Sequence, residues 1–305
     1  MRVAHISDLH VLDMAGVPFT RFLNKRATGW ANLRLKREHK HKTAHVGELL
    51  REIRRMEIDH VVITGDLTNL ALETEFVAVK RLFERELGLS PAEVSVVPGN
   101  HDLYTRGSLV ARRFVTYFSD YVVSDLPELA HALPLGPFPF VRLRGPIALI
   151  GLSSAVPRLP LVAAGVLGRG QREALARVLA HEEVRRRTPV LLLHHPPHHP
   201  ERLAKAIVEG LHDAAPLVRG LALDRPAYLL HGHLHRRMRT PLAGGIVSFG
   251  ATSASLEHED PDRMAGINLY VFDDATGALS SADSRVLDST ARTFHTRTLP
   301  LTTWL

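Results

Sequence analysis

Short apolar runs that end in polar loops recur along the sequence and constrain the fold more than any other feature. The runs are nearly all aliphatic, and the loops after them are rich in Asp, Asn, Gly or His; they occupy residues 3–6, 60–64, 94–97, 147–152, 190–193 and 227–230. Continuous apolar runs of this length are typical of strands buried on both faces of a sheet. The sequence therefore predicts a sheet with other layers packed on each side.

Amphipathic helices are predicted between several of these strands. Apolar residues recur at helical spacing in residues 45–56, 73–87 and 171–186. Alternation of strands and helices indicates βαβ units and a largely parallel sheet, in which the polar loops gather at the carboxyl ends of the strands. An α/β fold with ligand-binding loops along one edge is the expected architecture.

The helical pattern stops after residue 235. Three later segments, 245–251, 267–272 and 278–286, have the composition of strands joined by turns. We expect them to form a second, more antiparallel sheet packed on the first. Because the sequence shows no internal repeat and no convincing linker, residues 1–305 are interpreted as a single domain.

Composition narrows the chemistry. The 305 residues include no cysteine, so disulfides and thiolate metal sites are excluded, and a metal must be bound by His, carboxylate or amide groups. The formal charge of +6 favours anionic partners such as phosphorylated substrates, acidic lipid surfaces or nucleic acid. The N-terminus lacks the apolar stretch of a signal peptide, and no run of about 18 apolar residues appears, so a cytoplasmic protein is the default expectation.

A candidate set of metal ligands lies in the loops after the predicted strands. Asp8 and His10, two residues apart, can address one ion, and the two oxygens of Asp66 can bridge two ions. The full set is Asp8, His10, Asp66, Asn100, His194, His233 and His235. Carboxylate, imidazole and amide donors suit divalent cations, and a water bridging two such ions about 3.5–4 Å apart is acidified and attacks phosphorus in line. The alternative is that the acids are turn residues or helix caps and that Asn100 only holds a turn.

Five short motifs occur in a fixed order in residues 5–235: D-x-H, G-D, G-N-H-D, H-H-P-P and G-H-L-H. Together they resemble the calcineurin-like metallophosphoesterase superfamily. The resemblance implies a four-layer α/β/β/α sandwich with two mixed sheets and a dimetal-dependent hydrolase of phosphate esters. It also implies that Asp8, His10 and His235 bind the first metal, that Asp66 bridges, and that Asn100, His194 and His233 bind the second.

The same resemblance assigns roles beside the metals. His101 would contact the substrate phosphate and stabilise charge or protonate the leaving oxygen, and Asp102 would orient His101. His195 is expected to support the ligands or line the pocket, and Asn69 to form a turn or support the ligands. The expected cofactors are two divalent ions among manganese, iron, zinc, nickel and cobalt, with manganese favoured.

A basic segment with interleaved aromatic residues occupies residues 19–42. It is interpreted as an amphipathic insertion beside the metal site, and three readings are open: a solvated helix over the core edge, an interfacial helix on anionic lipid, or a contact with nucleic acid. The candidate membrane or substrate contacts are Arg26, Trp30, Arg34 and Arg37. Peripheral association with an anionic inner membrane surface is the sharper prediction.

Three functions are compatible with these motifs. A phosphodiesterase is favoured, because the compact chain resembles bacterial class III cyclic-nucleotide and glycerophosphodiester phosphodiesterases. The insertion instead looks like the branch that hydrolyses the pyrophosphate of UDP-2,3-diacylglucosamine in lipid A synthesis. A non-catalytic scaffold is the alternative of another class, but such members usually lose ligands, and this chain keeps them all. The expected substrate is a phosphorylated small molecule or a lipid-linked one; nucleic acid is not expected, because no partner-binding extension is visible.

Overall fold

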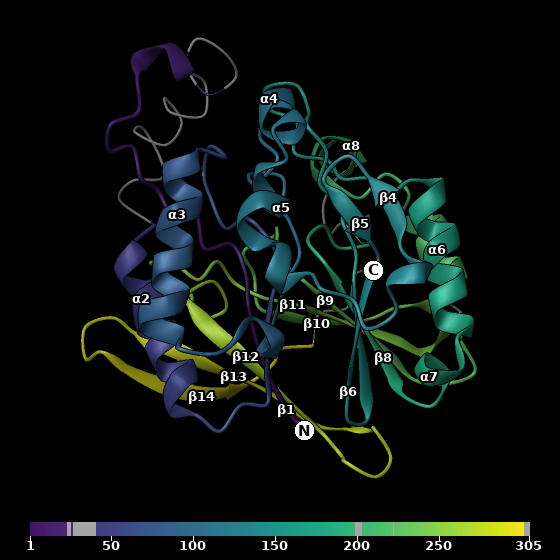
Figure 1. Cartoon of the computed structure of the whole chain (residues 1–305). Helices are drawn as coiled ribbons and strands as arrows, with labels where there is room; N and C mark the ends of the chain where they lie inside the picture. The colour runs from purple at the N-terminus through teal and green to yellow at the C-terminus, as the bar shows by residue number, and fades with distance from the viewer. Residues whose placement is uncertain (23–25, 27–40, 199–202, 222, 302–305) are drawn as a thin grey trace.

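Two six-stranded sheets lie at the centre of the fold, with helices on either side (Figure 1). The computed structural model describes residues 1–22, 26, 41–198, 203–221 and 223–301. The strand order of the first sheet is β14 (Thr293–Thr298), β13 (Leu279–Asp288), β12 (Gly266–Phe272), β1 (Arg2–Ile6), β2 (His60–Ile63) and β3 (Val94–Val96). The second sheet contains β10 (Met238–Pro241), β11 (Ile246–Gly250), β9 (Ala227–His231), β8 (Thr188–Leu193), β7 (Ile147–Gly151) and β6 (Phe140–Arg144).

Helices cover the outer faces of both sheets (Figure 1). On the side of the first sheet lie α2 (Thr43–Arg55) and α3 (Glu73–Leu82), the latter continued by a π-helical turn, Phe83–Leu87. On the side of the second sheet lie α6 (Arg169–Ala180), α7 (Glu182–Arg185) and α9 (Ala214–Gly220). The remaining elements are α4 (Arg106–Val110), α5 (Arg113–Phe118), α8 (Leu203–Glu209) and the hairpin of β4 (His131–Leu133) and β5 (Gly136–Phe138). None of the described helices has the length and apolar character needed to cross a lipid bilayer.

Side chains of β8 alternate between two apolar cores. Val190 and Leu192 belong to the core that also contains the strands of the first sheet, whereas Leu191 and Leu193 pack with the helices outside the second sheet. Alternation follows from the two-residue repeat of a strand. It confirms that these runs are apolar because both of their faces are buried.

The predicted fold class is confirmed, and one detail of the prediction is wrong. Both sheets are mixed: β1, β2 and β3 are parallel, as are β7, β8, β9 and β11. The strands after residue 235 do not form a separate antiparallel sheet. Instead β12 pairs with β1 and extends the first sheet, while β11 pairs with β9 in the second. Apolar composition predicts a strand but not its partner, which depends on where the chain returns.

One predicted helix is divided in two. Residues 171–186 contain α6 and α7 with His181 between them in an extended conformation, ψ 138°. The Nδ1 atom of His181 accepts a hydrogen bond from the backbone N–H of Glu183 at 3.3 Å and so caps α7. The apolar periodicity continues through this break, which is why the sequence alone predicts one helix.

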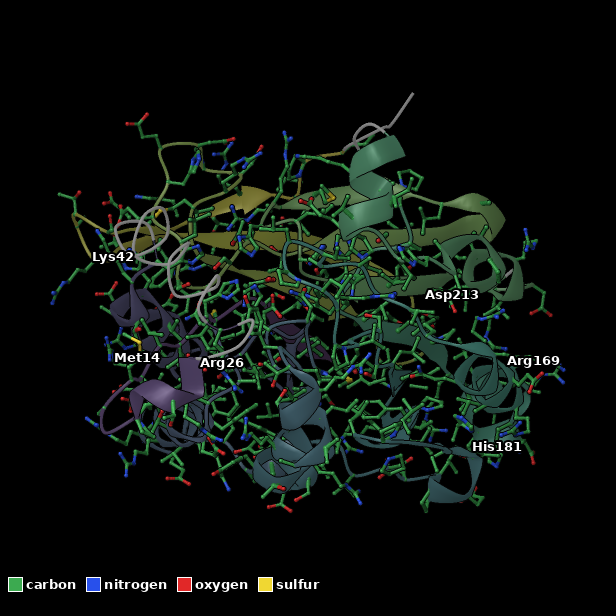
Figure 2. All side chains as sticks on the ribbon, turned by 90° about the horizontal axis from the view of Figure 1, so that it is seen from above. Met14, Arg26, Lys42, Arg169, His181 and Asp213 are labelled. Atoms are coloured by element: carbon green, nitrogen blue, oxygen red, sulfur yellow. The ribbon has the colours of Figure 1, made fainter. Side chains whose placement is uncertain are left out.

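Arg26 has a structural role, and its prediction as a membrane or substrate contact is wrong. Its side chain is buried; Nε donates to the carbonyl of Leu70 at 2.8 Å and Nη2 to the carbonyl of Ala71 at 3.2 Å. In the view of Figure 2 it is labelled inward of Met14 and Lys42, which lie at the same side of the molecule. Trp30, Arg34 and Arg37, like most of the basic segment, lie outside the described residues.

The Arg26→Ala variant is therefore expected to be less stable by about 1–3 kcal/mol, because the Leu70 carbonyl loses a donor in a buried place. The Ala71 carbonyl also loses Arg26 but still accepts from Arg113 at 2.9 Å. Urea unfolding followed by circular dichroism measures this loss. Arg169→Ala serves as the control, because Arg169 is 85% exposed and pairs with Glu173 on the same helix; its effect should stay within about 0.5 kcal/mol. Equal effects of the two substitutions would contradict the structural role of Arg26.

Candidate metal centre

The predicted ligands converge at the carboxyl ends of strands from both sheets. Asp8 and His10 follow β1, Asp66 follows β2, and Asn100 follows β3; from the second sheet, His194 follows β8, and His233 and His235 follow β9. Parallel strands place these loops on the same edge of each sheet. The structure thus brings all seven side chains to one place between the sheets.

The first group surrounds the carboxylate of Asp8. Its Oδ1 lies 3.0 Å from Nε2 of His235, and this nitrogen lies 3.2 Å from Nε2 of His10. The Oδ2 atom of Asp66 lies 4.0 Å from Nε2 of His10. Donor atoms of Asp8, His10 and His235 all lie within 4.8 Å of one another, as the ligands of a single cation must.

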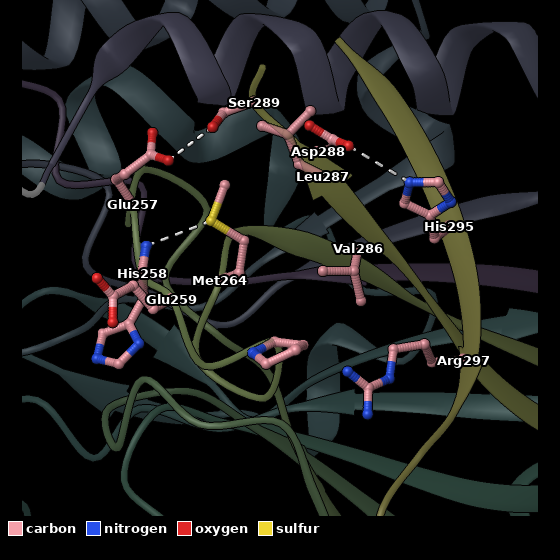
Figure 3. Close-up of a pocket in the computed structure, with 11 residues that line it drawn as sticks. Glu257, His258, Glu259, Met264, Val286, Leu287, Asp288, Ser289, His295 and Arg297 are labelled. Carbon is pink, nitrogen blue, oxygen red and sulfur yellow. Dashed lines mark hydrogen bonds and ion pairs between the residues drawn. The ribbon is translucent and has the colours of Figure 1, made fainter. Parts of the chain in front are cut away.

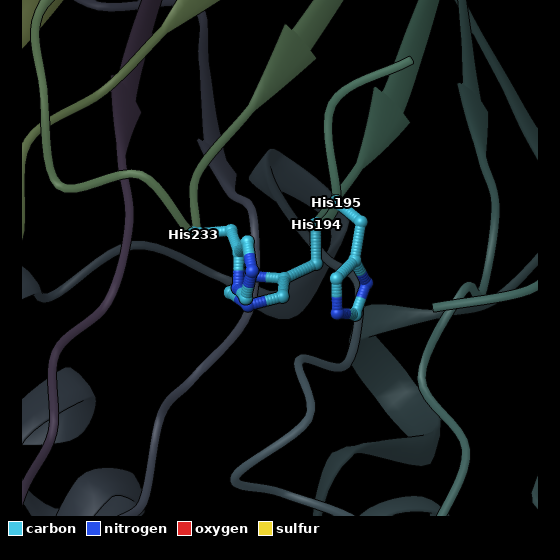
Figure 4. A group of neighbouring side chains, drawn as sticks. All are labelled: His194, His195 and His233. Carbon is cyan, nitrogen blue, oxygen red and sulfur yellow. The ribbon is translucent and has the colours of Figure 1, made fainter. Parts of the chain in front are cut away.

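The second group surrounds His194. Its Nδ1–H donates to the carbonyl of Thr64 at 2.7 Å, so Nε2 carries the lone pair in the neutral ring. That Nε2 lies 3.3 Å from Oδ2 of Asp66 and 3.2 Å from Oδ1 of Asn100. The ring of His233 lies 5.1 Å from that of His194 (Figure 4). Asp66 therefore lies between the two groups, in the position of a bridging ligand.

Burial and mutual charge set the protonation states of this cluster. Burial opposes ionisation of both acids, but His235 holds the pKa of Asp8 well below its usual range, and His194 lowers that of Asp66 to about 2. Burial also lowers the pKa of His233, to about 3. Against the effect of burial, Asp66 raises the pKa of His194 to about 9. A cation that binds Nε2 of His194 must therefore displace a proton from this ring.

Five of the ligands share an uncommon backbone conformation. Asp8, His10, Asp66, His233 and His235 have φ values between 47° and 70°, in the left-handed region that residues other than glycine rarely occupy. Such strain persists only where the surrounding structure enforces it, and it gathers at functional sites. The strands are thus followed by sharp turns that direct these side chains toward one another.

Two glycines make the Asp66 turn possible. Gly65 has φ 92°, as expected for a glycine that lets the chain turn after β2. Gly99 approaches Asp66 so closely that a Cβ atom there would lie 2.2 Å from Oδ1 of Asp66. Neither position has room for a side chain.

His101 lies beside the bridging acid. Its backbone N–H donates to Oδ1 of Asp66 at 2.7 Å, and its Nδ1–H donates to the carbonyl of Asn69 at 2.7 Å. Asn69 also donates from Nδ2 to the carbonyl of His10 at 2.5 Å, and it therefore connects His10 with His101. The ring of Tyr104, which sequence reasoning missed, stacks on His101 at 5.4 Å.

Asp102 acts on the backbone. Its carboxylate accepts from the N–H groups of Gly99 at 2.9 Å, Thr68 at 3.0 Å and Leu67 at 3.2 Å, so it holds together the loops that carry Asp66 and His101. That Asp102 orients His101 stays a prediction: Nδ1 of the His101 ring is held by the carbonyl of Asn69, and Asp102 reaches His101 through the Thr68 hydroxyl, which lies 3.1 Å from Oδ1 of Asp102 and 3.3 Å from the His101 carbonyl.

His195 supports the centre from outside. Its Nε2–H donates to the carbonyl of Ala163 at 2.7 Å, so Nδ1 accepts from the hydroxyl of Ser154, also at 2.7 Å. Burial, followed by the charges of His233 and His194, holds its pKa well below the usual range. Although its ring lies 4.5 Å from that of His233, both nitrogens have protein partners, as expected of a supporting residue (Figure 4).

A cavity of about 380 Å³ lies elsewhere, between β13, β14 and the loop that contains Glu257 (Figure 3). Its lining mixes acids, His295 and Arg297 with apolar side chains, and no group of converging metal donors found among the described residues lies there. The functional site is therefore the cluster between the sheets. His41 belongs beside that cluster, since its ring lies 5.1 Å from that of His10; no sequence motif singled it out.

This donor set defines a binuclear metal site. Buried carboxylates and imidazoles are stable together when cations neutralise them, and their oxygen and nitrogen atoms suit divalent metals. A model of the calcineurin-like phosphoesterase family matches residues 1–237. The chain belongs to this family and is a metal-dependent phosphoester hydrolase.

Solved structures share the fold at low identity. A dimetal phosphatase from Danio rerio is 15% identical with a TM-score of 0.60, and the match covers 98% of this chain and 99% of that one. A purple acid phosphatase from yellow lupin (13%, TM-score 0.55) and a 5'-nucleotidase from Candida albicans (13%, TM-score 0.50) are matched over 99% and 95% of this chain but only 54% and 52% of theirs. The chain thus spans about half the length of those two enzymes. A search of curated protein sequences finds no match.

Proposed function

We propose that the protein is a dimetal phosphodiesterase. The observation that carries this proposal is the kind of charge around the centre. Among the described residues, the charged side chains within 4.0 Å of the Asp8 and Asp66 carboxylates are the imidazoles of His10, His194 and His235, and none is a Lys or Arg. A phosphodiester carries one negative charge, whereas a monoester approaches two near neutral pH. A centre lined by imidazoles suits the diester, because a dianion calls for further cationic groups.

The contacts of these residues suggest which of them bind metal and which contact the substrate. Asp8, His10 and His235 would hold one ion, Asn100, His194 and His233 the other, and Asp66 both. When bound, divalent cations supply Lewis acidity and a water acidified for in-line attack. His101, fixed through Nδ1 by Asn69, would contact the phosphoryl group through Nε2 and stabilise developing charge or protonate the leaving oxygen.

A lipid-linked pyrophosphate such as UDP-2,3-diacylglucosamine is the second candidate substrate. The observation that favours it is a group of exposed apolar side chains at the tip of a loop and on the helix beside it. Leu159 and Leu161 in one loop are 77% and 88% exposed, and Ile207 on α8 is 60% exposed. The loop is bonded to α8 from Ala163 N to Val208 O at 2.8 Å. Its Ala163 carbonyl also accepts from His195, so the tip is tied to the metal centre. Exposed leucines of this kind fit acyl chains or an anionic membrane surface.

A hydrolysis panel on manganese-loaded protein tests both proposals. The substrates are bis(p-nitrophenyl) phosphate, p-nitrophenyl phosphate, cyclic AMP and UDP-2,3-diacylglucosamine in detergent micelles. A phosphodiesterase should cleave the aryl diester with kcat/KM at least about tenfold above the monoester. Protein carrying Asp66→Asn, prepared in parallel, measures any contaminating activity.

Each outcome separates the candidates. Faster cleavage of the monoester would contradict the phosphodiesterase proposal. Cleavage of the lipid nucleotide far above all three other substrates would favour the lipid-linked substrate instead. In that case replacement of Leu159 and Leu161 by Ser should raise KM for the lipid and leave that for the aryl diester unchanged.

A further inference from the structure

The ring of His41 packs against two ligands of the first metal position. It lies 5.1 Å from the ring of His10 at an interplanar angle of 80°, and 5.7 Å from that of His235 at 72°. His101 meets the same His10 ring at 4.9 Å and 86°. His10 therefore has two imidazoles edge-on to it, one from the G-N-H-D loop and one from the end of the basic segment.

Residues 253–257 hold His41 in this place. His41 forms an antiparallel bridge with Leu256, and its Nδ1 lies 2.8 Å from the hydroxyl of Ser255. Ser253, 3.4 Å from the same Nδ1, donates to the carbonyl of Asp8 at 2.6 Å. One short strip of chain thus connects the His41 ring to the backbone of a metal ligand.

The chain just after His41 is fixed by Glu257. Its carboxylate accepts from Nζ of Lys42 at 2.8 Å and pairs with Nε2 of His45 at 2.7 Å. The other carboxylate oxygen accepts from Ser289 at 2.6 Å, which ties this anchor to the end of β13 (Figure 3). His41 is consequently held by its own contacts with Ser255 and Leu256 and by the anchored residues that follow it, although it is not among the metal ligands.

His41 lies next to the ligands without being one of them. Asp8, His10 and His235 converge within 4.8 Å, and His41 belongs to none of the converging donor groups found among the described residues. The hydroxyls of Ser255 and Ser253 lie 2.8 and 3.4 Å from Nδ1 and hold the ring in place. An imidazole held beside a cation site is the kind of group that recognises a phosphoryl oxygen.

We propose that His41 is a phosphate-contacting residue that binds the substrate phosphoryl group beside the first metal position. The proposal rests on the phosphoesterase site described above and adds a second imidazole to His101. It gives the end of the basic segment a direct part in substrate binding.

Inorganic phosphate is the probe, because its binding does not require turnover. Calorimetric titration of phosphate into manganese-loaded protein should show Kd about five- to tenfold higher for His41→Ala than for the parent, as expected for one lost hydrogen bond to an anion. Metal content, measured by elemental analysis, should stay at the parent value. His295→Ala is the control, because His295 is 67% exposed on β14 and remote from the cluster; its Kd should match the parent.

Several results would overturn the role of His41. An unchanged Kd, a loss of metal from His41→Ala, or a parent that binds no phosphate would each do so. If His41→Ala does not fold, His41→Gln takes its place in the same titration. A parent that binds phosphate but cleaves no diester refutes the phosphodiesterase proposal, and the Kd comparison still decides the role of His41.

Discussion

Protein carrying Asp66→Ala is expected to bind neither metal ion tightly and to show no measurable turnover. Asp66 is the acid between the two donor groups, 3.3 Å from His194 and 4.0 Å from His10. Its removal takes a negative charge and a bridging oxygen pair from both positions at once. Elemental analysis after desalting and the rate of aryl diester hydrolysis measure the two losses.

Two further variants separate this effect from misfolding. Asp66→Asn keeps the size of the side chain and tolerates the left-handed backbone of this position, φ 51°, so it should fold and still lose metal. Asp224→Ala removes an exposed acid and should keep both the metal and the rate. Retention of two ions by folded Asp66→Ala would show that the bridging assignment is wrong.

The His101→Ala variant is expected to keep both ions and to lose about 10²–10³-fold in kcat. The ring is held by the Asn69 carbonyl and stacked on Tyr104, so it is poised beside the centre and is not needed to complete either donor group. The measurements are metal content and steady-state kinetics on the aryl diester.

The substitution His295→Ala again provides the matched control, with no expected change in kcat. Full activity of His101→Ala on every phosphate substrate would remove His101 from the reaction. Loss of metal along with the rate would instead make His101 a ligand, since donor atoms of His10, Asp66 and His101 also lie within 4.8 Å of one another.

Much of the candidate site is predictable from sequence because its residues follow strands. Each motif comes directly after an apolar run, and parallel strands carry their following loops to one edge. This logic reaches Asp8, Asp66 and Asn100 without any knowledge of tertiary contacts. It does not reach His41 or Tyr104, which become neighbours of the centre only through ring packing, nor the buried contacts of Arg26 with two carbonyls.

The partners of the strands were harder to predict than the strands themselves. The segments that became β11 and β12 have similar composition, yet one joins each sheet. The apolar sequence of a strand indicates that its two faces are buried, but it does not indicate which neighbouring strand forms hydrogen bonds with it. The role of Asp102 illustrates the same limit, because a carboxylate next to His101 in sequence bonds to backbone groups across the loop.

The division of the ligands between the two sheets has a consequence for the order of folding and metal uptake. Asp8, His10, Asp66 and Asn100 come from the first sheet, while His194, His233 and His235 come from the second. Neither half of the molecule holds a full set for either ion. During biosynthesis the early loops leave the ribosome well before their partners, so the nascent chain is expected to capture its metals only after the second sheet has docked. Metal uptake would then report completed assembly of the protein.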